Sequence, residues 1–472
     1  MDRYSIITPS QSLVLPFAGP GGIPTELLSE IFLHCADGAM DATNTIRTPL
    51  LVSQICSRWR ETALATPRLW SRLYLQFTST SFNLTELVQT WLTRSGGCPL
   101  TIYVFWEEPP FTPSHPVLDA LTAHSERWQS MFFYMPYHAF KSLAPIRKRL
   151  PLLTTLSLGT KDDPPPSSSL IGKLDMFSDA PLLRSLESVN ISPLIFKFPW
   201  SHLRTIPMMA VSSDDFIDIL LQTSHLEQGG FVFMDSGMMY GMGSVYSPHL
   251  RVQHNSLREV SIMTPPWNET VDLRGLFPQL TFPKLEFLQI CNLRSPFSSE
   301  FTGFLSRLGC LQTLHLRKTA LTDSQLIQGL KTIPTLTKLI VYSAPLQAPT
   351  VTHSLLSAMT WRPLLNVENG AANGGRRKPQ RQRQNLLPAL KSLELTIDYN
   401  VCDTFIEMVR SRVQFTSADS AGLNGGTPLS KDLPARLEKI RIRPTEDLGD
   451  RIYTALAEVA SYGVEISVED FC

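Results

Sequence analysis

The sequence lacks the short motifs that usually mark an enzyme active site, a nucleotide site or a metal site. Its 472 residues contain no GxxxxGKS or GxxxxGKT loop, no GxSxG elbow, no HExxH and no GxGxxG after a strand-like segment. The ten histidines show no other metal-ligand spacing. The sequence therefore predicts no catalytic residue, no cofactor and no metal site, and we expect a protein that is not an enzyme.

Net charge and long apolar runs are also missing. The 42 Lys and Arg residues balance 42 Asp and Glu residues, and charged residues make up only 18% of the chain. This balance argues against general nucleic-acid binding, which needs a strongly basic domain. No segment approaches the roughly 18–20 apolar residues of a membrane span, and the N-terminus does not resemble a signal peptide. We expect no membrane association and a cytoplasmic or nuclear protein.

The cysteines show no pairing pattern. They are odd in number, scattered, and never spaced as CxxC, which fits idle or buried thiols in a reducing compartment. A zinc site is not predicted. The seven are Cys35, Cys56, Cys98, Cys291, Cys310, Cys402 and Cys472.

The first patterned part of the chain begins at Ile23, after a tail at residues 1–20 that we expect to be flexible. Pro24 suits a first helical turn, where its missing N–H costs little. The pairs Leu27/Ile31 and Leu28/Phe32 are spaced i, i+4, so each pair lies on one helical face. This spacing predicts a short helix, followed by a polar loop at 35–47.

Thr-Pro pairs at Thr48-Pro49 and Thr66-Pro67 indicate two more helix starts, because a capping hydroxyl followed by proline is typical of that position. A core of three short helices is thin, and such modules commonly rely on a partner or a neighbouring domain. We expect Trp59 and Trp70 to fill this core and the face of Leu27, Leu28 and Ile31 to be exposed. The stripe after Pro49 consists of Val52, Ile55, Cys56, Trp59 and Ala63, and that after Pro67 of Leu69, Trp70 and Leu73.

The linked apolar, proline and tryptophan positions of residues 21–75 resemble an F-box, and more narrowly the F-box-like proteins common in mushroom-forming fungi. The polar loop at 35–47 is longer than in a compact F-box. The matching segments are Ile23-Pro24-x-Glu26-Leu27-Leu28-x-x-Ile31-Phe32, Leu51-Val52-Ser53-x-x-Cys56-x-x-Trp59-Arg60 and Pro67-x-Leu69-Trp70.

This resemblance implies docking to the Skp-type adaptor of a cullin–RING ubiquitin ligase. The alternative is that the same apolar residues are core residues of a helical cap on the remainder of the chain. The resemblance assigns the partner-binding surface to Pro24, Leu27, Leu28, Ile31, Leu51, Val52 and Pro67. It assigns the supporting core to Phe32, Ile55, Cys56, Trp59 and Trp70.

Residues 76–145 read as a transition into irregular repeats. Leu84–Arg94 has a helical apolar face, and Cys98–Trp106 alternates as a strand does. A pattern of apolar residues at i, i+3 and i+5 then recurs along the chain. Its copies are Trp128/Met131/Phe133, Leu153/Leu156/Leu158, Leu203/Ile206/Met208, Leu257/Val260/Ile262, Leu285/Leu288/Ile290, Leu311/Leu314/Leu316, Leu336/Leu339/Val341, Leu390/Leu393/Leu395 and Leu437/Ile440/Ile442, with degraded copies at Leu183/Leu186 and Leu226/Phe231/Phe233.

This pattern resembles the LxxLxL core of leucine-rich repeats. Several intervening segments have helical patterns, for example Asp214–Thr223 and Asp323–Thr332. Strand followed by helix, repeated, predicts an α/β fold in which parallel strands alternate with helices in an irregular solenoid over residues 146–472. A helix at Asp450–Ser461 and a strand at Val464–Val468 would end it. Residues 161–169, 366–385 and 417–427 are expected to be loops, the last two disordered.

Three further features have a functional and a plain interpretation. Gly229–Gly243 could offer an adaptable Met-rich surface, but a flexible loop at the edge of a repeat fits it better. The basic residues in 376–383 could be a nuclear localisation signal or a patch for an acidic partner, or simply a solvated loop. His315 should point away from Leu314 and Leu316, as a ligand contact or an ordinary surface histidine.

We therefore expect a substrate-recognition adaptor of a ubiquitin ligase, in which the solenoid binds an unidentified target protein. A leucine-rich-repeat scaffold that binds proteins without a ligase is the alternative. An enzyme would require a cleft with convergent polar residues, which the sequence does not indicate.

Overall fold

The computed structural model describes residues 22–37, 42–77, 84–106, 115–161, 174–234, 251–267, 271–293, 299–343, 351–362, 385–413 and 435–469. These residues form an α/β structure of two compact units. The first comprises the described residues of 1–156 and 179–182, and the second those of 157–178 and 183–472. Six cysteines are described, and all of them are free thiols.

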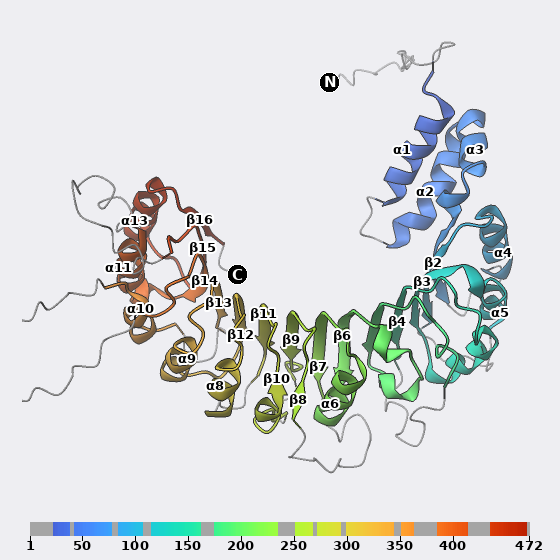
Figure 1. The fold of residues 1–472 in the computed structure, drawn as a ribbon. Coiled ribbons are helices and arrows are strands. Elements are labelled where there is room, and N and C mark those ends of the chain that lie inside the picture. The colour runs from blue at the N-terminus through green and yellow to red at the C-terminus, as the bar shows by residue number, and fades with distance from the viewer. Residues whose placement is uncertain are drawn as a thin grey trace, which may run out of the picture. The chain divides into compact units, whose positions relative to one another are not determined.

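The first unit begins with helices and continues with three parallel strands in chain order (Figure 1). Its strands are β1 (Arg72–Phe77), β2 (Leu100–Trp106) and β3 (Trp128–Tyr134). Its α-helices are α1 (Thr25–Asp37), α2 (Ala42–Ile55), α3 (Ser57–Leu64), α4 (Leu84–Arg94) and α5 (Pro116–Thr122). Its 3-10 helices are η1 (Pro67–Trp70), η2 (Ser125–Arg127) and η3 (Tyr137–Ile146).

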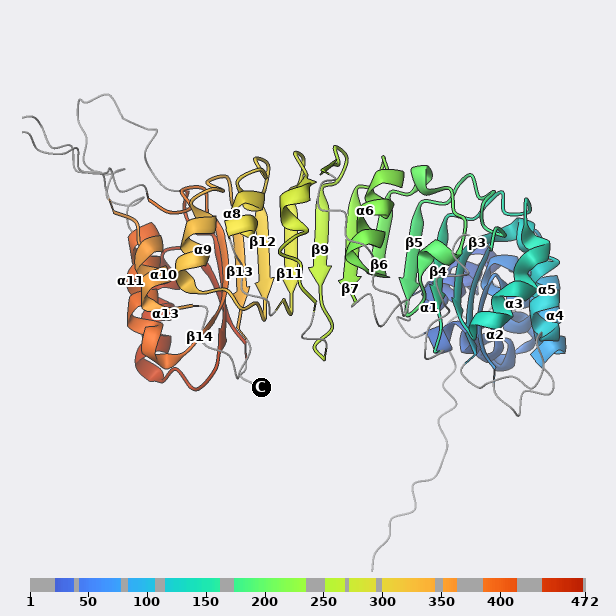
Figure 2. The same ribbon diagram turned by 90° about the horizontal axis from the view of Figure 1, so that it is seen from below.

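The second unit contains ten parallel strands, which Figure 2 shows side by side along most of the unit. They are β5 (Ser185–Val189), β6 (Thr205–Val211), β7 (Gln228–Phe233), β9 (Glu259–Met263), β11 (Phe287–Cys291), β12 (Thr313–Arg317), β13 (Lys338–Tyr342), β14 (Ser392–Ile397), β15 (Lys439–Pro444) and β16 (Glu465–Val468). With β4 (Thr155–Gly159), at the boundary of the units, the described residues hold fourteen such strands. β8 (Val252–Gln253) and β10 (Leu280–Thr281) form a separate pair.

Helices connect many of the strands of the second unit. The α-helices are α6 (Ser213–Gln222), α8 (Ser299–Leu305), α9 (Asp323–Leu330), α10 (His353–Met359), α11 (Cys402–Val413) and α13 (Asp450–Ser461). The 3-10 helices are η5 (Pro193–Ile195), η6 (Trp200–His202), η7 (Phe277–Gln279) and η8 (Tyr399–Val401). Capping boxes fix the starts of α6 and α9, where Ser212 and Thr322 accept hydrogen bonds from the backbone N–H three residues on. Parallel strands stacked in chain order are consistent with a repeat solenoid.

The recurring apolar pattern is confirmed as the core of the strands. Leu314 on β12 lies between Leu288 on β11 and Leu339 on β13, and Leu316 lies between Ile290 and Val341. All six are buried, with at most 1% of the residue exposed. Equivalent residues therefore form continuous rows across neighbouring strands, so that each strand closes the core of the next.

In the copy Leu203/Ile206/Met208 the first two residues are buried as expected, and the last is one position out of register. Met208 was expected to point inward, but Met209 is the buried residue and Met208 is partly exposed. The pairing of β6 with β7 shifts between Ile206 and Met209, which is the signature of a β-bulge at Pro207. A side chain at Gly230 on β7 would put its Cβ 2.3 Å from the carbonyl oxygen of Pro207, so this bulge requires a glycine opposite it.

The two widest gaps between copies do not interrupt the pairing of the strands. β13 pairs directly with β14, and β14 with β15, although 54 and 47 residues separate the corresponding leucines. Asn385, which was assigned to a disordered insert, is ordered: its side-chain amide accepts from the N–H of Arg362 at 3.0 Å and donates to the Arg362 carbonyl at 2.8 Å. These two hydrogen bonds join the ends of the segment at 363–384.

Several expectations fall outside the described residues. These are the tail at 1–20, the loop at 162–169, the inserts at 366–384 and 417–427 and the basic residues within 376–383. Of Gly229–Gly243, only 229–234 is described, and Gly229–Phe233 belongs to β7 instead of a loop.

Candidate partner-docking surface

The helical region at the start of the first unit differs from the expected three helices. The second apolar stripe is divided between α2 and α3, because Cys56 has an extended backbone (φ −157°, ψ 171°) that breaks the helix. α2 also begins at Ala42, so Pro49 lies inside it instead of at its start. The third stripe forms only the turn η1 and then enters strand β1 at Arg72.

The division of the stripe changes the assignment of the core. Ile55 and Cys56, predicted to be buried, are exposed, because the break at Cys56 turns the end of α2 away from the face that α3 buries. Phe32 is buried, and its ring lies 5.0 Å from that of the half-buried Trp59. The core between α1 and α3 therefore depends on this aromatic contact.

Trp70 links the helices to the strands that follow them. It is buried, its indole N–H donates to the Ala63 carbonyl at the end of α3 at 2.8 Å, and its ring packs edge-on against Trp91 of α4 at 4.8 Å. The guanidinium of Arg94 lies 4.4 Å from the centre of the Trp70 ring. The prediction of Trp70 as a core residue is confirmed, and its contacts extend beyond the helical region to α4.

The structure divides the seven residues of the predicted surface into two groups. Leu28 and Val52 are buried, which corrects their assignment to a partner surface, because they face the neighbouring helices. The exposed residues are Pro24, Leu27, Ile31, Leu51 and Pro67, of which Leu27 is 57%, Ile31 45% and Leu51 59% exposed. Sequence reasoning missed Leu50 and Leu64 and misplaced Ile55, which are also exposed apolar residues of this region.

The exposed leucines of α1 and α2 occupy equivalent positions, each directly before a buried residue. On α1 the exposed Leu27 precedes the buried Leu28, and on α2 the exposed Leu51 precedes the buried Val52. The two helices pack side by side and run antiparallel, as Figure 1 shows. Consider two antiparallel α-helices that bury the sides facing each other. In each helix, the residue just before a buried one is rotated by about 100° from it, and in both helices this rotation leads to the same side of the pair. Leu27 and Leu51 therefore belong to one side of the helix pair, and both are exposed there.

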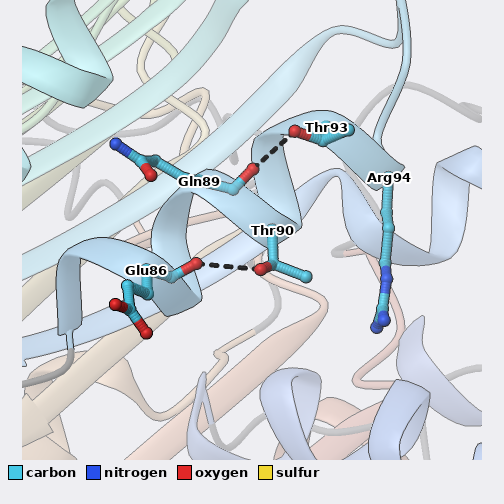
Figure 3. A pocket seen from close by; sticks show the side chains of 5 residues that line it. All are labelled: Glu86, Gln89, Thr90, Thr93 and Arg94. Atoms are coloured by element: carbon cyan, nitrogen blue, oxygen red, sulfur yellow. Dashed lines mark hydrogen bonds between the residues drawn. The ribbon is translucent and has the colours of Figure 1, made fainter.

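A shallow depression of about 350 Å³ lies on α4 and is lined by Glu86, Gln89, Thr90, Thr93 and Arg94 (Figure 3). All five side chains come from one helix. The hydroxyls of Thr90 and Thr93 donate to backbone carbonyls of their own helix, at 2.9 and 2.8 Å. These groups do not converge on a substrate-sized site. Within the described part of the chain, no group of three His, Cys, Asp or Glu residues is placed to hold a metal ion.

His315 lies on β12 and points away from Leu314 and Leu316, as predicted. Its ring packs edge-on against Tyr342 at 5.7 Å, and burial lowers the pKa of the imidazole below its ordinary value. At neutral pH this histidine is therefore an uncharged side chain on the strand face opposite the leucine rows.

No helix among the described residues is long and apolar enough to cross a membrane. No protein-family model matches the chain, and no curated protein matches its sequence.

Proposed function

We propose that the chain is a substrate-recognition adaptor of a Skp–cullin–F-box type ubiquitin ligase. In this proposal α1–α3 are an F-box that docks to the Skp-type adaptor, and the following strands are divergent leucine-rich repeats that bind a target protein. The protein would contribute proximity, holding its target near the ubiquitin-loaded enzyme, with no catalytic residue of its own.

The observation that supports this proposal is the set of exposed apolar residues on α1 and α2. The exposed part of a leucine or isoleucine side chain contributes no apolar burial within the chain, whereas burying such a side chain completely contributes about 1.5–3 kcal/mol. Leu27, Ile31 and Leu51 are each about half exposed, with fractions of 57%, 45% and 59%. The half of each side chain that a partner could still bury gives roughly 1 kcal/mol per residue.

Binding of the purified full-length chain to a Skp-type adaptor, measured by calorimetry, tests the proposal. We expect Leu27→Asp/Ile31→Asp to weaken binding at least about 100-fold, because two carboxylates would be buried without partners as the apolar contact is lost. The matched control is Leu182→Asp/Leu221→Asp, which changes leucines of similar exposure (42% and 53%) outside the helical region. This control should bind as the wild type does.

The proposal fails if the wild-type chain and Leu27→Asp/Ile31→Asp bind the adaptor equally poorly. The chain would then act as a ligase-independent scaffold, and α1–α3 would be only a cap on the strands. Equal weakening by the control pair would show that the loss reflects general destabilisation and would also count against a specific docking surface.

A further inference from the structure

The strands β12–β16 carry an unusual set of side chains on the face opposite their leucine rows, here called the outer face. The helices α8, α9, α10, α11 and α13 of this unit lie on the other side of these strands (Figure 1). Strand register aligns the outer-face residues into rows that run across the strands. The central row is His315, Ile340, Glu394, Arg441 and Ser467, and the cations of the flanking rows are Arg317, Lys338, Lys439 and Arg443.

Positive charge exceeds negative charge on this face. Three cations are matched one to one by close glutamates, and two arginines, Arg317 and Arg441, are left over. The matched pairs are Lys338 with Glu394 (2.6 Å), Lys439 with Glu465 (2.6 Å) and Arg443 with Glu469.

The two remaining guanidinium groups have no carboxylate of their own. Arg441 approaches only carboxylates that are already engaged, at 3.6 Å from Glu469 and 3.9 Å from Glu394, and its buried Nε has no hydrogen-bond partner. Arg317 is exposed and takes part in no ion pair among the residues described. The outer face therefore has unused capacity to bind negative charge.

Other polar groups of the same face are also without partners. In the described residues, eleven buried side-chain polar atoms lack a hydrogen bond, and four of them lie here: His315 Nε2, Ser392 Oγ, Arg441 Nε and Ser467 Oγ. Such atoms are rare in folded proteins, and a cluster of them on one face is explained by a group that binds there. They are not a general property of outer faces, because Ser261 on β9 donates to the side-chain oxygen of Gln289 on β11 at 3.0 Å.

We propose that the outer face of β12–β16 binds an extended acidic peptide segment of a target protein. Arg441 Nε can only donate, and the hydroxyls of Ser392 and Ser467 can donate as well, so a ligand that supplies acceptors fits these groups. Guanidinium groups hold carboxylates through paired hydrogen bonds. Five strands spaced about 4.8 Å apart extend over about 19 Å, which an extended peptide of about six residues matches. This inference rests on the proposed function in identifying the ligand as a target protein.

The face also predicts a pattern of acidic residues in the peptide. Arg317 on β12 and Arg441 on β15 are three strands apart and two residues apart along the strand direction, so their backbones are about 16 Å apart, and the reach of the long arginine side chains can shorten the distance between the guanidinium groups. Residues i and i+4 of an extended peptide are about 13 Å apart and point to the same side. Glu394 lies between the two arginines and would repel a carboxylate at i+2. The preferred sequence therefore has acidic residues at i and i+4 and a neutral residue at i+2.

Fluorescence anisotropy with labelled peptides and the full-length chain tests this inference. The probe is Gly-Glu-Ser-Ala-Ser-Glu-Gly, and the comparison peptides replace both glutamates by lysine or the central alanine by glutamate. We expect the probe to bind, the lysine peptide to bind at least about tenfold more weakly, and the central glutamate to give no gain. A single-stranded oligonucleotide serves as a polyanion of another class.

The variant Arg317→Gln/Arg441→Gln should weaken binding of the probe at least about tenfold. The matched control, Arg258→Gln/Arg410→Gln, removes two arginines that are paired with Glu286 and Glu458 and should leave binding unchanged. Arg317→Gln alone should weaken binding without affecting the fold, since Arg317 has no ion pair to lose.

The inference is overturned if the wild type does not bind the probe, if the double variant binds it as well as the control does, or if the oligonucleotide binds and the probe does not. None of these outcomes concerns adaptor docking. Leu27→Asp/Ile31→Asp should still bind the probe, and Arg317→Gln/Arg441→Gln should still bind the Skp-type adaptor, so the two proposals can fail separately.

Discussion

Arg412 on α11 offers the sharpest test of how the second unit is held together. Its residue exposure is 0%, and its guanidinium donates to the Met359 carbonyl at 2.8 Å, the Leu387 carbonyl at 3.0 Å and the Leu386 carbonyl at 2.5 Å. It makes no ion pair with any described carboxylate, and burial lowers its pKa to about 10. At neutral pH it is therefore a buried cation held by backbone carbonyls alone.

The cost of Arg412→Met follows from these contacts. Three hydrogen bonds from a charged donor contribute about 1.5–3 kcal/mol each, or about 4.5–9 kcal/mol together. Methionine carries no charge, so the variant avoids the desolvation penalty of the buried guanidinium, which offsets several kcal/mol of this loss. We expect a net loss of about 2–4 kcal/mol in local stability, concentrated where α11 meets the segment before β14.

Hydrogen–deuterium exchange measures this loss better than denaturant unfolding, because a chain with two compact units need not unfold in two states. A loss of about 2 kcal/mol corresponds to about 30-fold faster exchange of the amides around Leu386 and Leu387. The control is Arg410→Met, two residues away, whose pair with Glu458 is partly exposed (39% and 49% of the side chains) and contributes at most about 1 kcal/mol. Equal exchange in the two variants would refute the role assigned to Arg412.

Two further predictions concern pH and packing in the second unit. Burial lowers the pKa of His254 below its ordinary 6.5, so just below pH 6.5 the ring is protonated in the unfolded chain but still neutral in the folded chain. The contribution of His254 to the free energy of unfolding is therefore fully present above pH 6.5 and is lost as the pH falls toward the lowered pKa. His254→Gln, which retains a donor for the Thr223 carbonyl, should therefore show a shallower fall in unfolding midpoint between pH of about 7.5 and about 5.5, and an unchanged slope would contradict this. Leu314→Ala should cost about 2–5 kcal/mol in local stability, measured by hydrogen–deuterium exchange of the β11–β13 amides, because Leu314 is 0% exposed. Gln312→Ala, at an exposed position, should cost less than about 0.5 kcal/mol, and similar losses in the two variants would show that the leucine rows do not hold the unit together.

Much of the strand architecture could be predicted because its signal is local. A strand with one buried face needs apolar residues at every second position, which are positions i+3 and i+5 of the pattern. The apolar residue at position i lies in the turn before the strand. The pattern therefore identified most of the strands. β1 was missed because Leu69, Trp70 and Leu73 also fit a helical period, and the chain changes from η1 to β1 within that run. Periodicity alone cannot distinguish the two in so short a segment.

The candidate surface on α1 and α2 was predicted in part for a related reason. A helical pattern shows which residues share a face, but a shift of one residue separates the buried Leu28 from the exposed Leu27. Which of the two faces inward depends on the neighbouring helix. Ile55 is exposed beside the break between α2 and α3 at Cys56, and the sequence around Cys56 contains no proline or glycine that would have predicted this break.

The long-range polar contacts of the second unit could not be predicted, because their partners are distant in the sequence. Arg412 reaches carbonyls 25, 26 and 53 residues away, and Tyr342 donates to the Glu394 carboxylate at 2.7 Å across 52 residues. Stacking of the strands sets these distances, since it places residues from widely separated copies of the pattern next to one another. The leucine rows therefore specify the scaffold from local sequence, while the chemistry of the outer face arises only when the scaffold has formed. Any function that depends on Arg317 and Arg441 together must be read from the structure.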